Sequence, residues 1–409
     1  MRLGLSDLQP MKGGTMRAHL AIAVGVFAAA CGSTTTPEVS VSNSVNSDLT
    51  RSDCGAFVSQ RGNRIDVAPT GVDDTRNLQC AIDAAVASGR SASIRLSGGT
   101  FHTAQIVAKN FVGQIAGSGT AETVITTLGT PMFVTRDDFF SHGLPTPPGG
   151  ENPWPSLISF IDGDFSMSDL TIRVLDPAPT TGWTVFGLDQ IFGRLFQTLA
   201  GEIYIVGLSA HATFERIAFE GKNTPSDPLF GNNVYNAIFF VGEGSGPAPI
   251  AGALEVRQSA FIEVAAGAVA ADVQDATVSI VGNTSQRTSW PVQIADLAET
   301  RVTVAANRFQ DGLAGVQIVD ACPPGGALCG ISNTQLLVVG NQLAEFDGIE
   351  INATFASGVS CTVVGNDIHY DADNGGVAVL LGPATKDCRV VTKGAVRDQG
   401  TGNRVTIPP

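Results

Sequence analysis

The sequence predicts an all-β protein built as a solenoid of stacked coils, and three observations indicate this fold class. Four segments run alternating apolar residues into a Gly-Asn or Ala-Asn pair and a further apolar residue: 276–287, 300–311, 334–345 and 360–371. Each follows a second short strand pattern: 266–272, 290–296, 314–320 and 347–353. A unit of roughly 24 residues cannot bury its own apolar face, so the units must stack. Composition is the third observation, because 47 glycines and only 7% aromatic residues suit tight coils better than a helical core.

Residues 1–30 have the pattern of a signal peptide. A basic region leads into the apolar run AHLAIAVGVFAAA, which ends at Cys31. The FAAAC ending resembles a bacterial lipoprotein lipobox, with Ala28 where leucine is usual, so we expect Cys31 to carry a lipid. The alternative is cleavage after Ala30 and free secretion. The sequence therefore predicts an exported protein, lipid-anchored in the cell envelope or outer membrane, or otherwise secreted.

Residues 31–52 are rich in Ser and Thr and predict a flexible tether, and the folded domain is expected over 53–409. Six cysteines remain after the lipidation site, an even number in an exported chain. They fall into three local pairs that we expect to be disulfides: Cys54–Cys80, Cys322–Cys329 and Cys361–Cys388. The alternative is a set of reduced, buried thiols.

The charge of the chain limits its partners. The formal net charge is −14, which argues against nucleic acid or an anionic membrane surface as a general partner. It also disfavours a polyanionic glycan, unless calcium or a local arginine cluster bridges the two. A membrane contact is expected only through the lipid anchor, and we expect a monomer.

The ordered domain is expected to open with a helix. Leu78, Ile82 and Ala85 share one helical face, and Gly89 is a C-terminal stop signal. Asp73 and Asp74 precede this helix, and as N-terminal signals we expect them to cap it rather than to form a catalytic pair. Three short strands follow, separated by glycine-rich turns.

The opening of this domain resembles the pectate-lyase-like superfamily of right-handed parallel β-helices, the pectin-lyase fold. The likeness lies in G-V-D-D-T at 71–75, Q-C-A-I-D-A-A at 79–85, G-G-T-F at 98–101 and I-A-G-S-G-T at 115–120, and with the asparagine repeats it covers roughly residues 60–400. The resemblance implies a right-handed parallel β-helix in which the short helix caps the N-terminal end. It specifies fold more than function.

Residues 129–156 and 175–200 lack the strand rhythm, and we expect long loops there. The coils between and after them align so that Asn283, Asn307, Asn341 and Asn366 fall at one point of successive coils. We expect a left-handed residue at that turn and stacked amides that hydrogen-bond along the column, which is a structural role. By the resemblance, the other strand of each coil belongs to the sheet that carries the active groove.

Three of those other strands end in aspartate in consecutive coils: Asp272, Asp296 and Asp320. Carboxylates stacked at about 4.8 Å repel one another, which raises a pKa in the group or recruits a cation. We therefore consider the three as catalytic carboxylates, and Asp296 with Asp320 as calcium ligands, since calcium-dependent lyases of the superfamily use aspartates on that face. The alternative is that each aspartate opens a turn and caps backbone amides.

Strand alternation predicts that Gln293, Gln317 and Glu350 face outward as a polar column suited to sugar hydroxyls. Trp290, before the first of these strands, is a candidate ring for stacking on a pyranose, and Trp154 has a similar position before an earlier strand. Solvated surface and loop packing are the alternatives.

A lyase also needs a base, and Arg173, Arg216 and Arg301 are candidates by residue type only. The chain has neither the arginine-rich signature of pectate lyases nor the G-H-G and paired-Asp patterns of polygalacturonases. We expect a carbohydrate-active protein, a polysaccharide lyase or hydrolase acting in a groove on the first parallel sheet. The second hypothesis is a non-catalytic surface module that binds glycans or builds the envelope. Calcium is the one cofactor that the pattern suggests.

Overall fold

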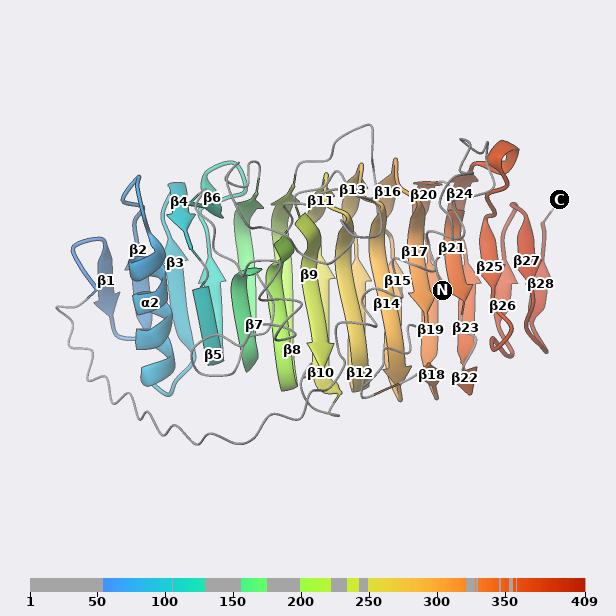
Figure 1. Cartoon of the computed structure of the whole chain (residues 1–409), viewed down its shortest axis with the longest axis horizontal. Coiled ribbons are helices and arrows are strands. Elements are labelled where there is room, and N and C mark those ends of the chain that lie inside the picture. The colour runs from blue at the N-terminus through green and yellow to red at the C-terminus, as the bar shows by residue number, and fades with distance from the viewer. Residues whose placement is uncertain are drawn as a thin grey trace, which may run out of the picture.

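The chain forms coils stacked along a single axis, from β1 and α2 at one end to β28 at the other (Figure 1). The computed structural model describes residues 54–408 apart from 105, 129–155, 175–198, 222–233, 243–248, 321–327, 329, 346, 353–355 and 358. Every strand pairing among the described residues is parallel, except for the hairpin of β1 (Val58–Arg61) with β2 (Arg64–Val67). Crossovers between parallel strands take the right hand, so the architecture is the right-handed parallel β-helix that the sequence predicts.

Three parallel sheets form the solenoid, and a coil in its middle contributes a strand to each. The third sheet ends at β24, before the last coils. The first sheet contains β5 (Ile106–Ala116), β7 (Ser156–Arg173), β8 (Leu199–Glu220), β9 (Val234–Gly242), β12 (Ala266–Val281), β14 (Trp290–Ala298), β17 (Ala314–Val319), β21 (Asp347–Asn352), β25 (Val379–Leu381) and β27 (Val396–Asp398). Of these, β5, β7, β8 and β12 bend into the second sheet, and β7 and β8 continue into the third.

The second sheet adds β2, β3 (Ala92–Leu96), β10 (Ile250–Arg257), β15 (Arg301–Ala305), β19 (Gln335–Val339), β23 (Ser360–Val364), β26 (Arg389–Val391) and β28 (Arg404–Thr406). The third sheet adds β4 (Gly99–Thr103), β6 (Thr123–Thr127), β11 (Ala260–Ile262), β13 (Thr284–Gln286), β16 (Arg308–Gln310), β20 (Gln342–Glu345) and β24 (Asp367–Tyr370). The short strands β18 (Ile331–Ser332) and β22 (Ala356–Ser357) extend the line of β14, and the 3₁₀ helix η1 (Ala372–Asn374) follows β24.

The core lies inside the coils, where alternate residues of all three sheets meet. Phe160 stacks on Phe165 with ring centroids 3.8 Å apart, and Phe219 stacks on Phe261 at 5.7 Å. These rings and the surrounding Ile, Leu and Val side chains are buried in one continuous cluster. Because each coil buries its apolar side only against its neighbours, stability in this fold comes from stacking.

The helix α2 (Thr75–Ala87) packs against the N-terminal coils, as the resemblance implies (Figure 1). Leu78, Ile82 and Ala85 are buried on one face. Asp74 is fully buried, and its carboxylate accepts the backbone N–H of Thr70 at 2.7 Å and of His102 at 3.1 Å. Both oxygens are therefore engaged by backbone outside the helix, and Asp74 makes no side-chain capping bond to α2, so the predicted cap is wrong for Asp74. Asp73 makes that contact instead, because its Oδ1 accepts the N–H of Thr75 at 2.9 Å.

The asparagine column is present at the corner between the second and third sheets. Asn283 donates its amide to Oδ1 of Asn307 at 3.1 Å, Asn307 to Asn341 at 2.9 Å, and Asn341 to Asn366 at 2.9 Å. The left-handed residue of each turn is the one before the asparagine, with φ of 68° at Gly282. The same position holds Ala306, Gly340 and Gly365 in the next coils.

Two disulfides join neighbouring segments as the sequence predicts. Cys54 is bonded to Cys80 of α2, and Cys361 is bonded to Cys388 in the next coil with a Cα–Cα distance of 4.4 Å. Cys31 and the pair Cys322–Cys329 lie outside the described residues. Within the described ranges, no helix has the length and apolar character needed to cross a bilayer.

Candidate functional site

The outer face of the first sheet is where the sequence predicts a groove. On β8, β9 and β12, the residues that alternate with the core positions are Tyr204, Phe239 and Val269. They point away from the core, yet they are almost completely buried. The rings of Tyr204 and Phe239 contact each other across adjacent coils in a tilted arrangement, with centroids 5.6 Å apart. This sheet is therefore buried on both faces over these coils. The strands of a parallel sheet that is buried on both faces can have continuous apolar sequences instead of alternating ones.

Polar side chains replace the apolar ones in the next coils of the same column. Gln293 of β14, Gln317 of β17 and Glu350 of β21 are in register and lie on the side of the sheet opposite to the core. Gln293 Nε2 donates to Gln317 Oε1 at 2.7 Å, and Gln317 Nε2 donates to Glu350 Oε2 at 2.9 Å. We call these three residues the polar row. The predicted alignment is correct.

The predicted exposure of the polar row is wrong. Gln293, Gln317 and Glu350 are 5%, 0% and 4% exposed. Strand alternation fixes the side of the sheet on which a side chain lies, but it does not determine whether that side is open to solvent. The donors and acceptors of the row instead satisfy one another, and Asn352 Nδ2 adds a bond to Glu350 Oε1 at 3.3 Å.

Trp290 is also buried, at 1% exposure, so its ring is not an open platform for a sugar. Its indole nitrogen has no hydrogen-bond partner among the described residues. Trp154 lies outside them. A buried indole N–H without a partner is costly, and it marks the start of β14 as a place where a polar group of a ligand would be stabilised.

The predicted aspartates occur at the turn from the first sheet to the second. Asp272 and Asp296 stack in adjacent coils, and both adopt left-handed backbone conformations with φ of 52° and 50°. Asp296 Oδ1 accepts the N–H of Gly330 at 2.9 Å, and Asp272 Oδ1 accepts that of Leu328 at 3.2 Å. Burial raises the pKa of Asp272 above its ordinary value, and the Leu328 N–H partly offsets this.

Asp162 shows the same arrangement three coils earlier in the chain. Its φ is 54°, and its Oδ1 accepts the N–H groups of Leu208 and Ser209 at 2.8 and 3.0 Å. The geometry therefore matches the alternative in which aspartate opens the turn and caps backbone amides. Asp320, at the equivalent position after β17, is half-buried.

Calcium does not fit this column. Calcium in proteins takes six to eight oxygen ligands, whereas Oδ1 of Asp272 and Oδ1 of Asp296 each accept a backbone N–H, which a cation at the same oxygen would oppose. No cluster of three or more His, Cys, Asp or Glu side chains that could hold a metal occurs in the described part of the chain.

Two of the candidate arginine bases are held in ion pairs. Arg216 makes a bidentate contact with Asp169, with distances of 2.6 and 2.9 Å, and Arg173 pairs with Glu220 at 2.6 Å. The hydrogen bond to Asp169 raises the pKa of Arg216, which is the opposite of what a base requires. Arg301 is exposed on the second sheet, away from the polar row.

A second carboxyl beside the polar row was not singled out from the sequence. Asp347 opens β21 three residues before Glu350, is half-buried, and accepts the N–H of Val377 at 2.8 Å through Oδ1. The signal was present in the segment DGIEIN, where two acidic residues occur within one apolar strand. Glu350 and Asp347 thus place two carboxyl groups on one strand of the first sheet, but residues three apart on a strand lie on opposite sides of it, so only Glu350 belongs to the polar row.

No protein-family model matches the chain, and no curated protein matches it. Among solved structures, a polygalacturonase from Erwinia carotovora ssp. carotovora is 12% identical, with 92% of this chain and 98% of that chain covered and a TM-score of 0.44. The Dettilon tailspike protein gp208 is 12% identical, with 84% and 67% covered and a TM-score of 0.39.

The ORF18 protein of Geobacillus virus E2 is 11% identical, with 82% of this chain covered and a TM-score of 0.39. This chain spans 58% of the length of that viral protein. At these values the fold assignment rests on the strand pairing described above.

Proposed function

We propose that this protein is an exported, carbohydrate-active β-helix protein that hydrolyses a polysaccharide at the polar row of the first sheet. The observation that supports this most directly is the hydrogen-bonded sequence Gln293–Gln317–Glu350, which ends in a carboxyl group and follows Tyr204, Phe239 and Val269 in the same column. Polar groups are costly to bury, so a row of them on a sheet that elsewhere packs Tyr, Phe and Val requires a reason.

The row offers the groups that saccharide chemistry uses. Amide side chains donate to and accept from sugar hydroxyls, and the Trp290 N–H lies at the start of the same strand as Gln293. The spacing along the row is that of the coils, about 4.8 Å per step. The row is only 0–5% exposed, so a saccharide chain would meet one amide or carboxyl group in each of β14, β17 and β21 only where the side chains that cover the row move aside.

A hydrolase uses two carboxyl groups, and Glu350 supplies one of them. One carboxyl protonates the glycosidic oxygen as the bond from that oxygen to the anomeric carbon breaks. The other removes a proton from water, whose oxygen forms the new bond to the anomeric carbon, either directly or after a covalent intermediate. A hydrolase is favoured over a lyase because Arg173 and Arg216, two of the candidate bases, are held in ion pairs.

Export and anchoring form part of this proposal. The two disulfides are typical of an oxidising compartment. The signal sequence and the lipobox-like ending at Cys31 supply the route and the anchor.

The test is release of new reducing ends from a panel of acidic and neutral polysaccharides by the full chain. We expect Glu350→Gln to lower the rate by about 10²- to 10⁴-fold, because a carboxyl used in proton transfer contributes that much. The control is Glu299→Gln, an exposed glutamate at the turn after β14, which should retain activity. Cleavage that persists unchanged in a folded Glu350→Gln variant would overturn the proposal.

A second candidate is a non-catalytic glycan-binding module. The observation that favours it is the near-complete burial of the polar row, because side chains that satisfy one another can serve packing alone. Binding of a polysaccharide without any release of reducing ends would select this candidate.

A further inference from the structure

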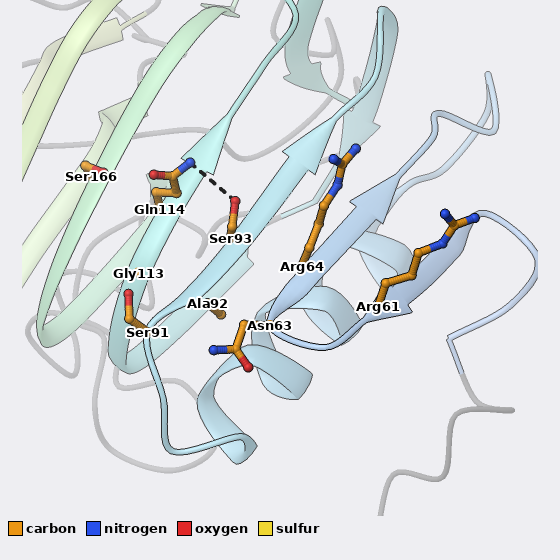
Figure 2. A pocket seen from close by; sticks show the side chains of 9 residues that line it. All are labelled: Arg61, Asn63, Arg64, Ser91, Ala92, Ser93, Gly113, Gln114 and Ser166. Carbon is orange, nitrogen blue, oxygen red and sulfur yellow. Dashed lines mark hydrogen bonds between the residues drawn. The ribbon is translucent and has the colours of Figure 1, made fainter.

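An open groove lies on the outer face of the second sheet, at the N-terminal end of the solenoid. It has a volume of about 510 Å³ and is lined by the β1–β2 hairpin together with β3, β5 and β7. Figure 2 shows the side chains of Arg61 and Arg64 extending from the hairpin, with Ser93, Gln114 and Ser166 on the successive strands beside it. This groove is far along the axis from the polar row of β14, β17 and β21.

Four of the lining residues form one straight row. Arg64 pairs in register with Ser93, Ser93 with Gln114, and Gln114 with Ser166. Their strand neighbours Ile65, Ile94, Ile115 and Met167 belong to the core, so these four side chains lie on the outer side. The row spans about 14 Å over four coils. Gln114 Nε2 contacts Ser93 Oγ at 3.3 Å, which leaves its carbonyl oxygen available to a ligand.

The groove is locally cationic in an acidic chain of net charge −14. Arg61 is exposed and forms no ion pair with any described residue. Arg64 is paired with Asp66 at 2.7 Å, but its side chain is 55% exposed, and such pairs exchange partners at little cost. Guanidinium groups bind carboxylate and sulfate oxygens in a bidentate manner.

The remaining lining residues set the chemistry of the ligand. Asn63, Ser91 and the row contribute amide and hydroxyl groups, and no aromatic ring lines the groove. A neutral sugar that depends on ring stacking is therefore disfavoured. A ligand rich in hydroxyls that also carries negative charge fits both the donors and the cations.

We propose that this groove binds an acidic saccharide, with its carboxylate or sulfate groups on Arg61 and Arg64 and its hydroxyls on Ser93, Gln114 and Ser166. The chain would thereby recognise a polyanionic glycan despite its own negative charge. This inference does not depend on Glu350 being a catalytic group, because the groove and the polar row lie on different sheets.

The test measures binding of three tetrasaccharides to the full chain by calorimetry. The probes are tetragalacturonate, its methyl ester and a sulfated galactan tetrasaccharide. We expect tetragalacturonate to bind at least about tenfold more tightly than its methyl ester, and to weaken between about 50 and 300 mM salt. Preference for the sulfated probe over the ester would assign sulfate as the anion and would also support the proposal.

Variants separate the groove from general charge effects. Arg61→Ala should weaken binding about five- to tenfold, and Arg61→Lys should restore part of it. The matched control is Arg389→Ala, an exposed arginine on β26 in the same sheet at the other end of the solenoid. Equal losses for Arg61→Ala and Arg389→Ala, binding of both acidic probes no tighter than that of the ester, or no binding of either acidic probe would overturn the proposal.

Discussion

The coils have two corners with buried polar groups, and these groups have hydrogen-bond partners at one corner but lack some of them at the other. At the corner between the second and third sheets, Asn283, Asn307 and Asn341 each donate to a carbonyl and to the next asparagine and accept from a backbone N–H, and Asn366 ends the column. Asn307, for example, donates to Ile280 O at 2.9 Å and to Asn341 Oδ1 at 2.9 Å, while its Oδ1 accepts the N–H of Asn283 at 2.8 Å. Nothing in this part of the column is left unsatisfied.

At the corner between the third and first sheets, two carboxyl groups are buried without full compensation. Glu202 has the same coil position as the core residue Leu157, and neither of its oxygens has a hydrogen-bond partner among the described residues. Burial raises the pKa of Glu202 well above its ordinary value, and the nearby Glu220 adds to the effect. Glu345 has one oxygen bonded to the Gly312 N–H and one without a described partner.

The difference shows that the backbone geometry recurs from coil to coil, whereas the hydrogen bonding of buried polar side chains does not. The asparagine corner holds register and is insensitive to pH, because its groups do not titrate. The other corner holds carboxyl groups that are neutral when protonated and expensive when ionised. We therefore expect the two corners to fail under different conditions, and the predictions below proceed from the largest expected effect to the smallest.

Glu345→Gln tests the titrating corner. Burial is the main cause that raises the pKa of Glu345 to about 8, from an ordinary value of 4.5. Its contribution to stability is therefore complete below about pH 4.5 and is lost as the pH rises through 8. We expect the variant to gain roughly 3 to 5 kcal/mol over wild type across that window, measured by denaturant unfolding at a series of pH values. The exposed Glu122→Gln should differ from wild type by under about 0.5 kcal/mol at every pH.

A flat difference between Glu345→Gln and wild type from pH 4 to 9 would show that the carboxyl titrates normally. The two corners would then not differ in the pH dependence of their stability, whatever the mean stability of the variant.

Asn307→Ala tests the satisfied corner. The change removes two donated bonds and leaves the N–H groups of Asn283 without their acceptor, so we expect a loss of about 3 kcal/mol that does not vary with pH. Asn366→Ala is the matched control, because Asn366 ends the described column and is only half-buried, so water can replace its bonds. We expect about 1 kcal/mol there, and equal losses at both sites would argue against a continuous column.

Arg173→Met gives the smallest effect. Its ion pair with Glu220 is partly exposed, so we expect a loss of no more than about 1 kcal/mol that shrinks in high salt. Thermal unfolding with and without added salt measures it. A larger loss would mean that Arg173 also stabilises the carboxyl groups at this corner, where Glu220 lies near Glu202.

Much of the fold was predictable because its signals are local. The Gly-Asn repeats predicted the corner between the second and third sheets, and the spacing of Leu78, Ile82 and Ala85 predicted the buried face of α2. Proximity along the chain and along the axis is also why Cys361 and Cys388 could be paired.

Properties that depend on what lies over a sheet were not predictable. The alignment of Gln293 with Gln317 followed from strand period, but their burial did not, because alternation carries no information about the layer outside. Glu202 was missed for a related reason. It is a single acidic residue in the strand GEIYIV, and only the core position of its neighbour Leu157 reveals that it points inward.

The most direct test of the proposed site is amide hydrogen exchange of the full chain with neutral and acidic oligosaccharides that span several coils. Binding at the polar row predicts slower exchange in β14, β17 and β21, and loss of that protection in Gln317→Leu. Acidic oligosaccharides should add a separate protected region over β2, β3 and β5. Protection confined to that N-terminal groove with every saccharide, and none in β14, β17 or β21, would contradict the account of the first sheet.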